Sequence, residues 1–320
     1  MRQAGRYMPE YRKLRERHSI LELCHAPELA AQVTLQPVAR LGVDAAIVFA
    51  DILLPFEPLG LGLSFVAGEG PQIAQPIRDP GAVERLPTIN PEEELAFVLD
   101  AIRLVRKELP GDVALIGFAG APFTLASYAI EGGPSRTFTK TKGLMYQAPD
   151  AWNRLLGKLA ELVGRFLAAQ VAAGADAVQL FDSWAGTLAP ADYRAYAQPH
   201  SRRALALAAE AGAPVIHFGT GTGPFLEDFA AAGGDVIGVD WRVPLDDAWR
   251  RIGGSETRAI QGNLDPAALL ASAVERGRQA RDVLARAGGR PGHIFNLGHG
   301  VLPQTDVEAV RAVVELVHGA

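Results

Sequence analysis

The stretch Ala177–Ala211 reads AVQLFDSWAGTLAPADYRAYAQPHSRRALALAAEA and contains one complete strand–loop–helix unit. The run Ala177–Phe181 is short and mostly apolar, which is typical of a buried strand. Polar residues interrupt the run, and a helical pattern begins at Pro190. Proline suits the first turn of a helix, because its missing N–H has no partner there. Gly212 follows, and glycine readily adopts the left-handed conformation common at helix ends.

The same alternation recurs along the whole chain. Further strands are expected at Ala45–Ala50, Ala114–Phe118, Val215–Phe218, Val236–Val239, Arg258–Gln261 and His293–Asn296, with an eighth implied at the very start, ending near Met1–Gln3. Helical patterns are expected at Pro27–Leu41, Pro91–Leu109, Pro149–Ala173, Pro190–Ala211, Pro224–Ala232, Pro244–Ile252, Pro266–Ala287 and Pro303–Val317. Because parallel neighbours need crossovers, this repetition predicts a parallel sheet. Eight units favour a single-domain (β/α)8 TIM-type barrel over residues 1–320, with an open doubly wound sheet as the alternative.

One segment departs from this alternation. Residues 60–77, GLGLSFVAGEGPQIAQPI, predict a glycine-turned hairpin inserted after the second strand of the barrel. No second domain boundary is visible, because glycine and proline are spread along the chain rather than clustered.

Charge and cysteine content exclude several classes of protein. The chain of 320 residues has a formal net charge of −5, so nucleic acid is not an expected partner, since phosphate neutralisation needs a broad basic face. The single cysteine, Cys24, excludes an intrachain disulfide and a multi-thiolate zinc site and fits a cytoplasmic location. The most apolar window, Ala45–Phe56, is short and carries Asp51, so no membrane helix is expected. The N-terminus lacks the apolar region of a signal peptide.

Polar side chains appear where the apolar runs stop. In a barrel these ends share one face, the face that carries catalytic groups. The expected rim residues are Asp51, Asp182, Ser183, Asp240, Asn263 and His299. Each could instead cap a helix or form a turn. That alternative is weaker for Asp51, because a carboxylate inside the apolar run IVFADILLPF needs a hydrogen-bond or cationic partner.

The first seventeen residues, MRQAGRYMPEYRKLRER, hold six cations and two anions, a net charge of +4 that leaves −9 on the remainder. Arg12 to Arg17 fit an exposed helix. Arg2 and Arg6 instead flank Gly5 in a non-helical stretch after the implied first strand. We therefore expect these two arginines at the rim, where guanidinium groups could hold carboxylates.

Two other patterns are weaker. The loop Gly219–Gly223 follows a strand, but a G-x-G-x-x-G register from Gly219 meets Pro224, so no dinucleotide cofactor is expected. A phosphate or carboxylate contact from its amides stays open. No histidine or cysteine pair has zinc-ligand spacing, so no metal is expected. His217 is expected in the interior, and Tyr128 either on a short rim helix or in the core.

The chain resembles the uroporphyrinogen decarboxylase family. The resemblance rests on MRQAGRYMPEYR, FADILLPFEPLG, GFAGAPFTLASYAIEGG, LFDSWAG, VDWR, QGNLDP and FNLGHGVLPQT, which run in the family's order from Met1 to the C-terminal helix. It implies a cytosolic homodimer of distorted (β/α)8 barrels, and an enzyme of haem biosynthesis that works without metal or organic cofactor. The implied reaction converts the four acetates of uroporphyrinogen III to methyls, giving coproporphyrinogen III. The implied catalytic and substrate-binding residues are Arg2, Gln3, Arg6, Asp51, Tyr128, Ser183 and His299.

These residues suit that chemistry. Arginines would bind the eight substrate carboxylates, and Asp51 would accept hydrogen bonds from the pyrrole N–H groups and stabilise a ring cation formed by protonation. Tyr128, a further catalytic candidate, would orient the substrate with Ser183 and His299. The proton donor stays open between Arg2, water and a substrate carboxylic acid.

Two alternative functions, and one departure from the family, also follow from the sequence. A corrinoid- or thiol-dependent methyltransferase of the same barrel would need a His–Cys–Cys zinc set, but Cys24 is the only thiol. A non-catalytic tetrapyrrole-binding protein could lack Asp51. Family members carry a helix and the start of the first strand before MRQAGRY. We therefore expect either a start assigned at an internal methionine or a truncated first strand.

Overall fold

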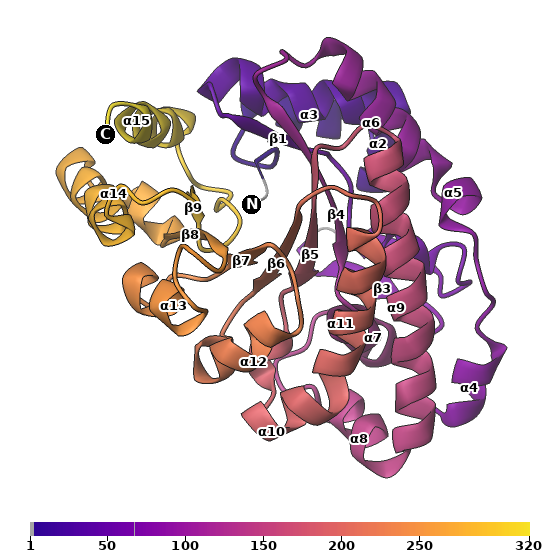
Figure 1. The fold of residues 1–320 in the computed structure, drawn as a ribbon. Helices are drawn as coiled ribbons and strands as arrows, with labels where there is room; N and C mark the ends of the chain where they lie inside the picture. The colour runs from indigo at the N-terminus through magenta and orange to yellow at the C-terminus, as the bar shows by residue number, and fades with distance from the viewer. Residues whose placement is uncertain (1–2, 67) are drawn as a thin grey trace.

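The computed structural model describes residues 3–66 and 68–320, and within them one curled parallel sheet has seven strands. The order is β1-β4-β5-β6-β7-β8-β9, so each strand lies beside the next in the chain apart from a separate hairpin, β2 and β3 (Figure 1). The bounds are β1 Ala45–Ile47, β4 Ala114–Gly120, β5 Ala177–Asp182, β6 Val215–Gly219, β7 Val236–Gly238, β8 Ala259–Leu264 and β9 His293–Leu297. Every strand predicted from Ala45 onward is confirmed, and so is the parallel α/β architecture.

Helices cover the outside of the sheet (Figure 1). They are α1 Pro9–Arg15, α2 Ile20–His25, α3 Pro27–Leu41, α4 Pro80–Arg85, α5 Pro91–Glu94, α6 Ala96–Glu108, α7 Pro122–Glu131, α8 Thr139–Gln147, α9 Pro149–Ala172, α10 Pro190–Asp192, α11 Gln198–Ala209, α12 Leu226–Ala231, α13 Leu245–Arg251, α14 Ala273–Ala287 and α15 Val307–His318. Short turns are η1 Leu54–Phe56, η2 Ala185–Thr187, η3 Tyr193–Ala197, η4 Gly223–Phe225 and η5 Pro266–Leu270, of which η3 is a π-helical segment. Among the described residues, none of these helices combines the length and the apolar character that a membrane span requires.

Apolar packing of the longest helix shows how the layers hold together. α9 starts at Pro149, as its sequence predicts, and contacts β4, β5 and α11. Its Trp152, Leu155 and Leu159 are at most 2% exposed. Burying side chains of this size contributes roughly 1.5–3 kcal/mol each. The strand ends are therefore mounted on a rigid scaffold.

The segment between β1 and α4 contains the hairpin. β2 (Leu63–Val66) and β3 (Gly70–Ile73) pair antiparallel, with Leu63 opposite Ile73. Both of these residues are buried in the main core, so the hairpin packs against the barrel rather than standing free.

The N-terminal segment packs between the two ends of the sheet, β1 and β9. The Gln3 side chain donates to Ala45 O at 2.7 Å and accepts from Ile47 N at 2.9 Å. One amide thus bonds to the strand edge as a neighbouring strand would. Behind it, Ala4, Tyr7, Met8 and Tyr11 form an apolar cluster with Phe49, Val301 and Val307.

The predicted eighth strand is not found among the described residues. Met1 and Arg2 lie outside them, and Gln3 is not in a strand. Within the described part of the chain, β1 and β9 have no strand between them. The Gln3 amide bonds to β1 instead of a backbone ladder.

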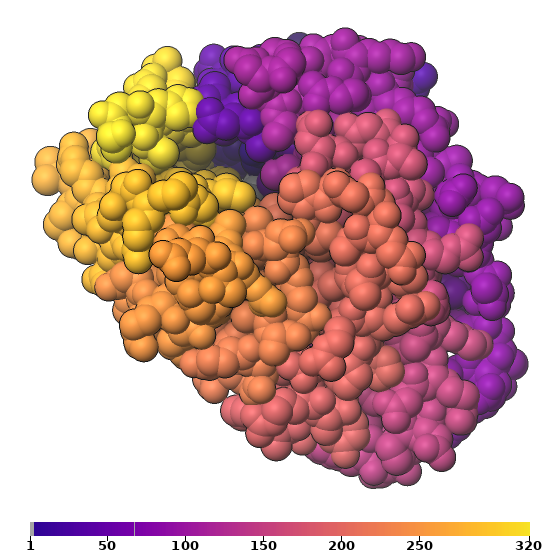
Figure 2. All heavy atoms as spheres, in the orientation of Figure 1, coloured from indigo at the N-terminus to yellow at the C-terminus, as the bar shows by residue number. Residues whose placement is uncertain are grey.

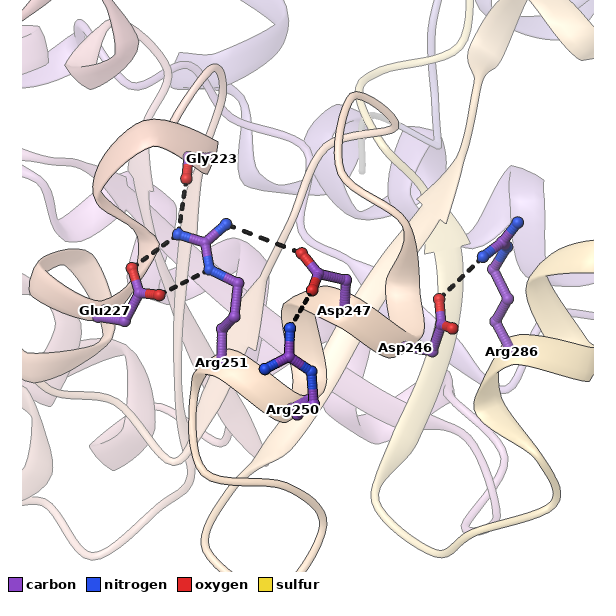
Figure 3. Close-up of polar contacts among 7 residues, drawn as sticks. All are labelled: Gly223, Glu227, Asp246, Asp247, Arg250, Arg251 and Arg286. Carbon is purple, nitrogen blue, oxygen red and sulfur yellow. Dashed lines mark hydrogen bonds and ion pairs between the residues drawn. The ribbon is translucent and has the colours of Figure 1, made fainter.

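Ion pairs join the outer helices near the C-terminal half (Figure 3). The Arg251 guanidinium of α13 bonds to Glu227 of α12 at 2.6 Å and to Gly223 O at 2.8 Å. Arg286 of α14 pairs with Asp246 of α13 at 2.9 Å. Arg251 is only 22% exposed, so its contacts fix η4, and with it the loop after β6, against α13.

Candidate active site at the carboxyl ends of the strands

Asp51 lies just beyond β1, as predicted, and is half-buried. Its Oδ1 accepts a hydrogen bond from Leu53 N at 2.9 Å. The following turn is anchored by Leu53, Leu54 and Phe56, which are at most 1% exposed. The carboxylate therefore has a rigid apolar base, which is the setting in which a fixed charge acts most strongly.

Tyr128 and Ser183 come from neighbouring strand–helix units. Tyr128 lies on α7, the short helix that follows β4, and its ring stacks on Trp184 with centroids 3.8 Å apart. Ser183 directly follows β5 and precedes Trp184. The sequence did not single out Trp184, although its place in FDSW beside the candidate serine was a usable signal.

Asp182 is the last residue of β5 and is fully buried. Its Oδ1 accepts from the Thr124 hydroxyl of α7 at 2.7 Å, whereas its Oδ2 has no hydrogen-bond partner among the described residues. Burial raises the pKa of Asp182 to about 7, and the Thr124 hydrogen bond partly opposes that rise. The sequence placed Asp182 at the rim but could not show that it lies behind the site.

Asp240 has a structural role that the sequence also allowed. Its two oxygens accept from Gly221 N at 2.7 Å and Arg242 N at 3.0 Å, and its carboxylate pairs with the Arg242 guanidinium. The Gly221 amide, which could have met a ligand anion, is thus used internally. Asn263 donates to Asp240 O at 2.9 Å. Both predicted rim residues therefore connect loops to one another.

The loop after β5 joins the same set of contacts. The Thr220 hydroxyl donates to Ser183 O, and Gly186 N donates to Thr220 O at 3.1 Å. A Cβ at Gly186 would lie 2.3 Å from Thr220 O, so only glycine allows this approach. Ser183 is consequently held in place by the next loop.

Of the two arginines predicted at the rim, only Arg6 lies within the described residues. Arg6 is exposed, and its guanidinium has no ion-pair partner within residues 3–66 and 68–320. Arg12 donates to Arg6 O at 3.0 Å and to Tyr7 O at 3.2 Å, which fixes the backbone that carries Arg6. Both amide atoms of Gln3 are bonded to β1. Arg2 lies outside the described residues.

His299 is exposed in the loop after β9. Its Nδ1 accepts from Gly300 N at 2.7 Å, so the neutral ring carries its proton on Nε2. A Cβ at Gly298 would lie 2.5 Å from Trp241 N, so glycine lets this loop rest on the end of β7. Figure 2 shows a hollow where the yellow C-terminal part of the chain faces the indigo N-terminal part.

Side chains of the metal-ligand type do not cluster in the part of the chain that the structure describes. No group of three or more His, Cys, Asp or Glu side chains in the described part of the chain could hold a metal ion. Cys24 is buried, and burial together with Asp51 and Glu57 raises the pKa of its thiol. A buried thiol of raised pKa is a poor ligand and nucleophile.

The chain matches known proteins over its full length. The family model described as "Uroporphyrinogen decarboxylase (URO-D)" matches residues 1–320. Proteins named uroporphyrinogen decarboxylase from Sorangium cellulosum and Carboxydothermus hydrogenoformans are 60% and 56% identical over 318 residues, covering 99% of this chain and 90% of each relative. A solved structure titled "methyltransferase from Methanosarcina mazei" has a TM-score of 0.80 at 20% identity, covering 93% of this chain and 87% of that one. At that identity the likeness shows the fold, not the activity.

Proposed function

This chain belongs to the uroporphyrinogen decarboxylase family, and we propose that Asp51, Arg6, Tyr128, Ser183 and His299 form its active site. The protein is a carboxy-lyase of tetrapyrrole biosynthesis, and the methyltransferase alternative is not favoured. The observation that carries the assignment of residues is the mounting of Asp51. Its half-buried carboxylate lies just after β1, beside a turn whose Leu53, Leu54 and Phe56 are at most 1% exposed.

The substrate's charge explains the cationic side of the rim. Uroporphyrinogen carries eight carboxylates, and a guanidinium binds carboxylate through two parallel hydrogen bonds. Arg6 is exposed and has no ion-pair partner in the described part of the chain, so it can take such a group without breaking an internal contact. Arg2, outside the described residues, keeps its predicted role beside it. Gln3 positions this segment on β1 through its amide.

The reaction needs an electron sink. A proton adds to the pyrrole carbon next to the one that bears the acetate, and the ring becomes cationic at the acetate-bearing carbon. The bond to the carboxylate breaks, carbon dioxide leaves, and its electron pair neutralises the ring as an exocyclic methylene. A proton then reaches the methylene, and loss of the ring proton restores the pyrrole. The net change per acetate is one proton taken up and one carbon dioxide released.

Asp51 acts on the cationic ring that forms during this reaction. Its carboxylate accepts hydrogen bonds from the pyrrole N–H groups and stabilises the cation. Because Leu53 N and the buried turn hold it in place, little reorganisation is needed when the charge forms. The Tyr128 hydroxyl, Ser183 and the Nε2–H of His299 orient the acetate and propionate groups.

We further propose the finer features that the family implies. The four acetates of uroporphyrinogen III become methyls, giving coproporphyrinogen III for haem formation. The protein works as a cytoplasmic homodimer, and residues 1–320 act as one domain with the 60–77 hairpin as its insertion. The names of the full-length relatives support the substrate.

The test compares two aspartates at opposite ends of β1. Asp51→Asn is expected to lower kcat about 100-fold or more under anaerobic turnover of uroporphyrinogen, because it removes the charge that stabilises the cation. Asp44→Asn is the control, since Asp44 is 84% exposed and pairs with His318 at 3.0 Å. Product chromatography measures both. Wild-type turnover by Asp51→Asn, with a folded protein, would remove Asp51 from this role.

A further inference from the structure

We infer that Asp182 and Thr124 are positioning residues for the decarboxylation, because together they hold the loop after β5 against α7 and so set Tyr128 and Ser183 relative to each other. The inference rests on the roles proposed above for those two residues. Neither Asp182 nor Thr124 touches solvent, so each acts through a neighbour and not on substrate.

The link is a short series of hydrogen bonds. The Thr124 hydroxyl donates to Asp182 Oδ1 at 2.7 Å and accepts from Trp184 N at 3.2 Å. Thr124 is fully buried, and so is Asp182. The hydroxyl therefore bonds on both sides of Ser183, to the residue before it and to the residue after it. One side chain of α7 thereby fixes the backbone that presents the serine.

Trp184 carries the link on to Tyr128. Tyr128 follows Thr124 by four residues, so both lie on one face of α7, a turn apart. The Trp184 backbone bonds to the first of these residues and its ring stacks on the second, at 3.8 Å between centroids. Phe138 meets the Trp184 ring edge-on at 4.9 Å. Trp184 is thus held at two points of α7 and from a second side.

The state of Asp182 supports a functional reason for its presence. A carboxyl that only closed the fold would be expected to have both oxygens bonded, as Asp240 does. Asp182 Oδ2 and the Tyr193 hydroxyl both lack a partner among the described residues, although both are buried. Tyr193 comes from η3, and burial and the nearby Asp182 raise its pKa. Burying a carboxyl oxygen that has no hydrogen-bond partner is costly. Here the buried carboxyl of Asp182 accepts the hydrogen bond from Thr124 directly before Ser183 in the chain.

The experiment removes the hydroxyl of Thr124 and, in a separate control variant, the hydroxyl of Ser127 on the same helix, α7. Thr124→Val keeps the shape of the side chain and loses both hydrogen bonds. We expect kcat to fall about tenfold with KM within about twofold, because a misplaced group weakens the transition state more than binding. The near-UV circular dichroism of the stacked Tyr128–Trp184 pair should weaken too. Thr124→Ser should restore kcat to within about threefold of the wild type.

Ser127→Ala is the matched control. Ser127 is fully buried on α7, but its hydroxyl donates at 2.8 Å to Phe123 O within the helix. It should lower thermal stability without changing kcat or the near-UV signal. Asp182→Leu removes the same Thr124 bond from the other side and should reproduce the loss of kcat, which keeps the test open should Thr124→Val not fold.

Two outcomes separate this inference from the proposed function. Wild-type kcat and near-UV signal in folded Thr124→Val and Asp182→Leu, with an impaired Tyr128→Phe, would overturn the positioning role alone. Wild-type kcat in Tyr128→Phe would instead overturn the role proposed for Tyr128.

An equal loss of kcat in Ser127→Ala and Thr124→Val would also overturn the positioning role, because general loosening of α7 would explain both.

Discussion

Asp182 and Asp240 occupy similar places in the sheet, one at the end of β5 and the other just after β7, and both are almost completely buried. Their partners differ. Asp240 accepts from two backbone amides and pairs with a guanidinium, whereas Asp182 has one hydroxyl donor and an oxygen with no partner in the described part of the chain. Asp240 joins the loops after β6 and β7, which carry none of the proposed site residues, although the first of them also contacts Ser183 O through Thr220. Asp182 directly precedes Ser183 in the chain.

The difference teaches that burial alone does not show what a rim carboxyl does. A satisfied carboxylate in this position stabilises the fold. A buried carboxyl with an oxygen that has no hydrogen-bond partner costs stability. The predictions below test whether the two aspartates really differ in this way.

The largest expected effect is on the pH dependence of stability. The pKa of Asp182 is about 7 in the folded protein and about 4 in an unfolded chain. Between these values the unfolded chain releases a proton that the folded protein keeps. The free energy of unfolding therefore falls as pH rises from 4 to 7, by on the order of 4 kcal/mol for three pKa units. Asp182→Asn should lack this fall, as measured by urea unfolding at pH 4, 6 and 8.

His217 makes the comparison with the variant necessary. Burial lowers the pKa of His217 to about 3, so the folded protein loses stability as pH falls from about 6.5 towards that value. This trend opposes that of Asp182 in wild-type protein. The difference between wild type and Asp182→Asn isolates the aspartate. Parallel stability curves for the two proteins would show that Asp182 is ionised when folded.

The next effect is the loss of a satisfied carboxylate. Asp240→Ala leaves the Gly221 and Arg242 amides without their acceptor, and we expect a loss of about 3 kcal/mol of unfolding free energy at pH 7. Asp247→Ala is the control, since Asp247 is 39% exposed and pairs with the exposed Arg250 and, at 4.0 Å, with Arg251 (Figure 3). Its loss should cost less than about 1 kcal/mol. Denaturant unfolding measures both. Equal losses would mean that the Asp240 contacts add nothing beyond a surface pair.

Much of the fold could be predicted because its signals are local. Apolar runs mark the strands, and prolines mark the starts of helices such as α3 and α9. The start of the barrel could not be predicted in this way. The sequence predicts Gln3 at the end of an implied strand, but it does not show that the Gln3 amide would bond to β1 itself. Such a contact depends on residues 42 or more positions apart.

The sequence predicts which residues lie at the strand ends, but it does not predict the role of each one. Strand ends locate Asp51, Ser183 and His299, since polar residues stop apolar runs there. FDSW and VDWR place an aspartate at similar points, and nothing within either motif tells their roles apart. The distinction comes from Thr124 in one case and Gly221 in the other, both distant in sequence.

The smallest expected effect shows which donors satisfy the Asp240 carboxylate, the Arg242 guanidinium or the backbone amides. Arg242 is 54% exposed, so its guanidinium pair with Asp240 is largely screened, and it lies 4.2 Å above the Trp241 ring. Arg242→Gln removes both contacts and should cost about 1 kcal/mol or less. It keeps the backbone N–H of residue 242 and that of Gly221, which are the donors that Asp240→Ala leaves unpaired. Unfolding in low salt and in 1 M NaCl measures the difference, which should shrink in high salt because screening weakens the wild-type pair. A cost as large as that of Asp240→Ala would mean that the guanidinium, not the amides, satisfies this carboxylate, and the contrast with Asp182 would then rest on one charge pair.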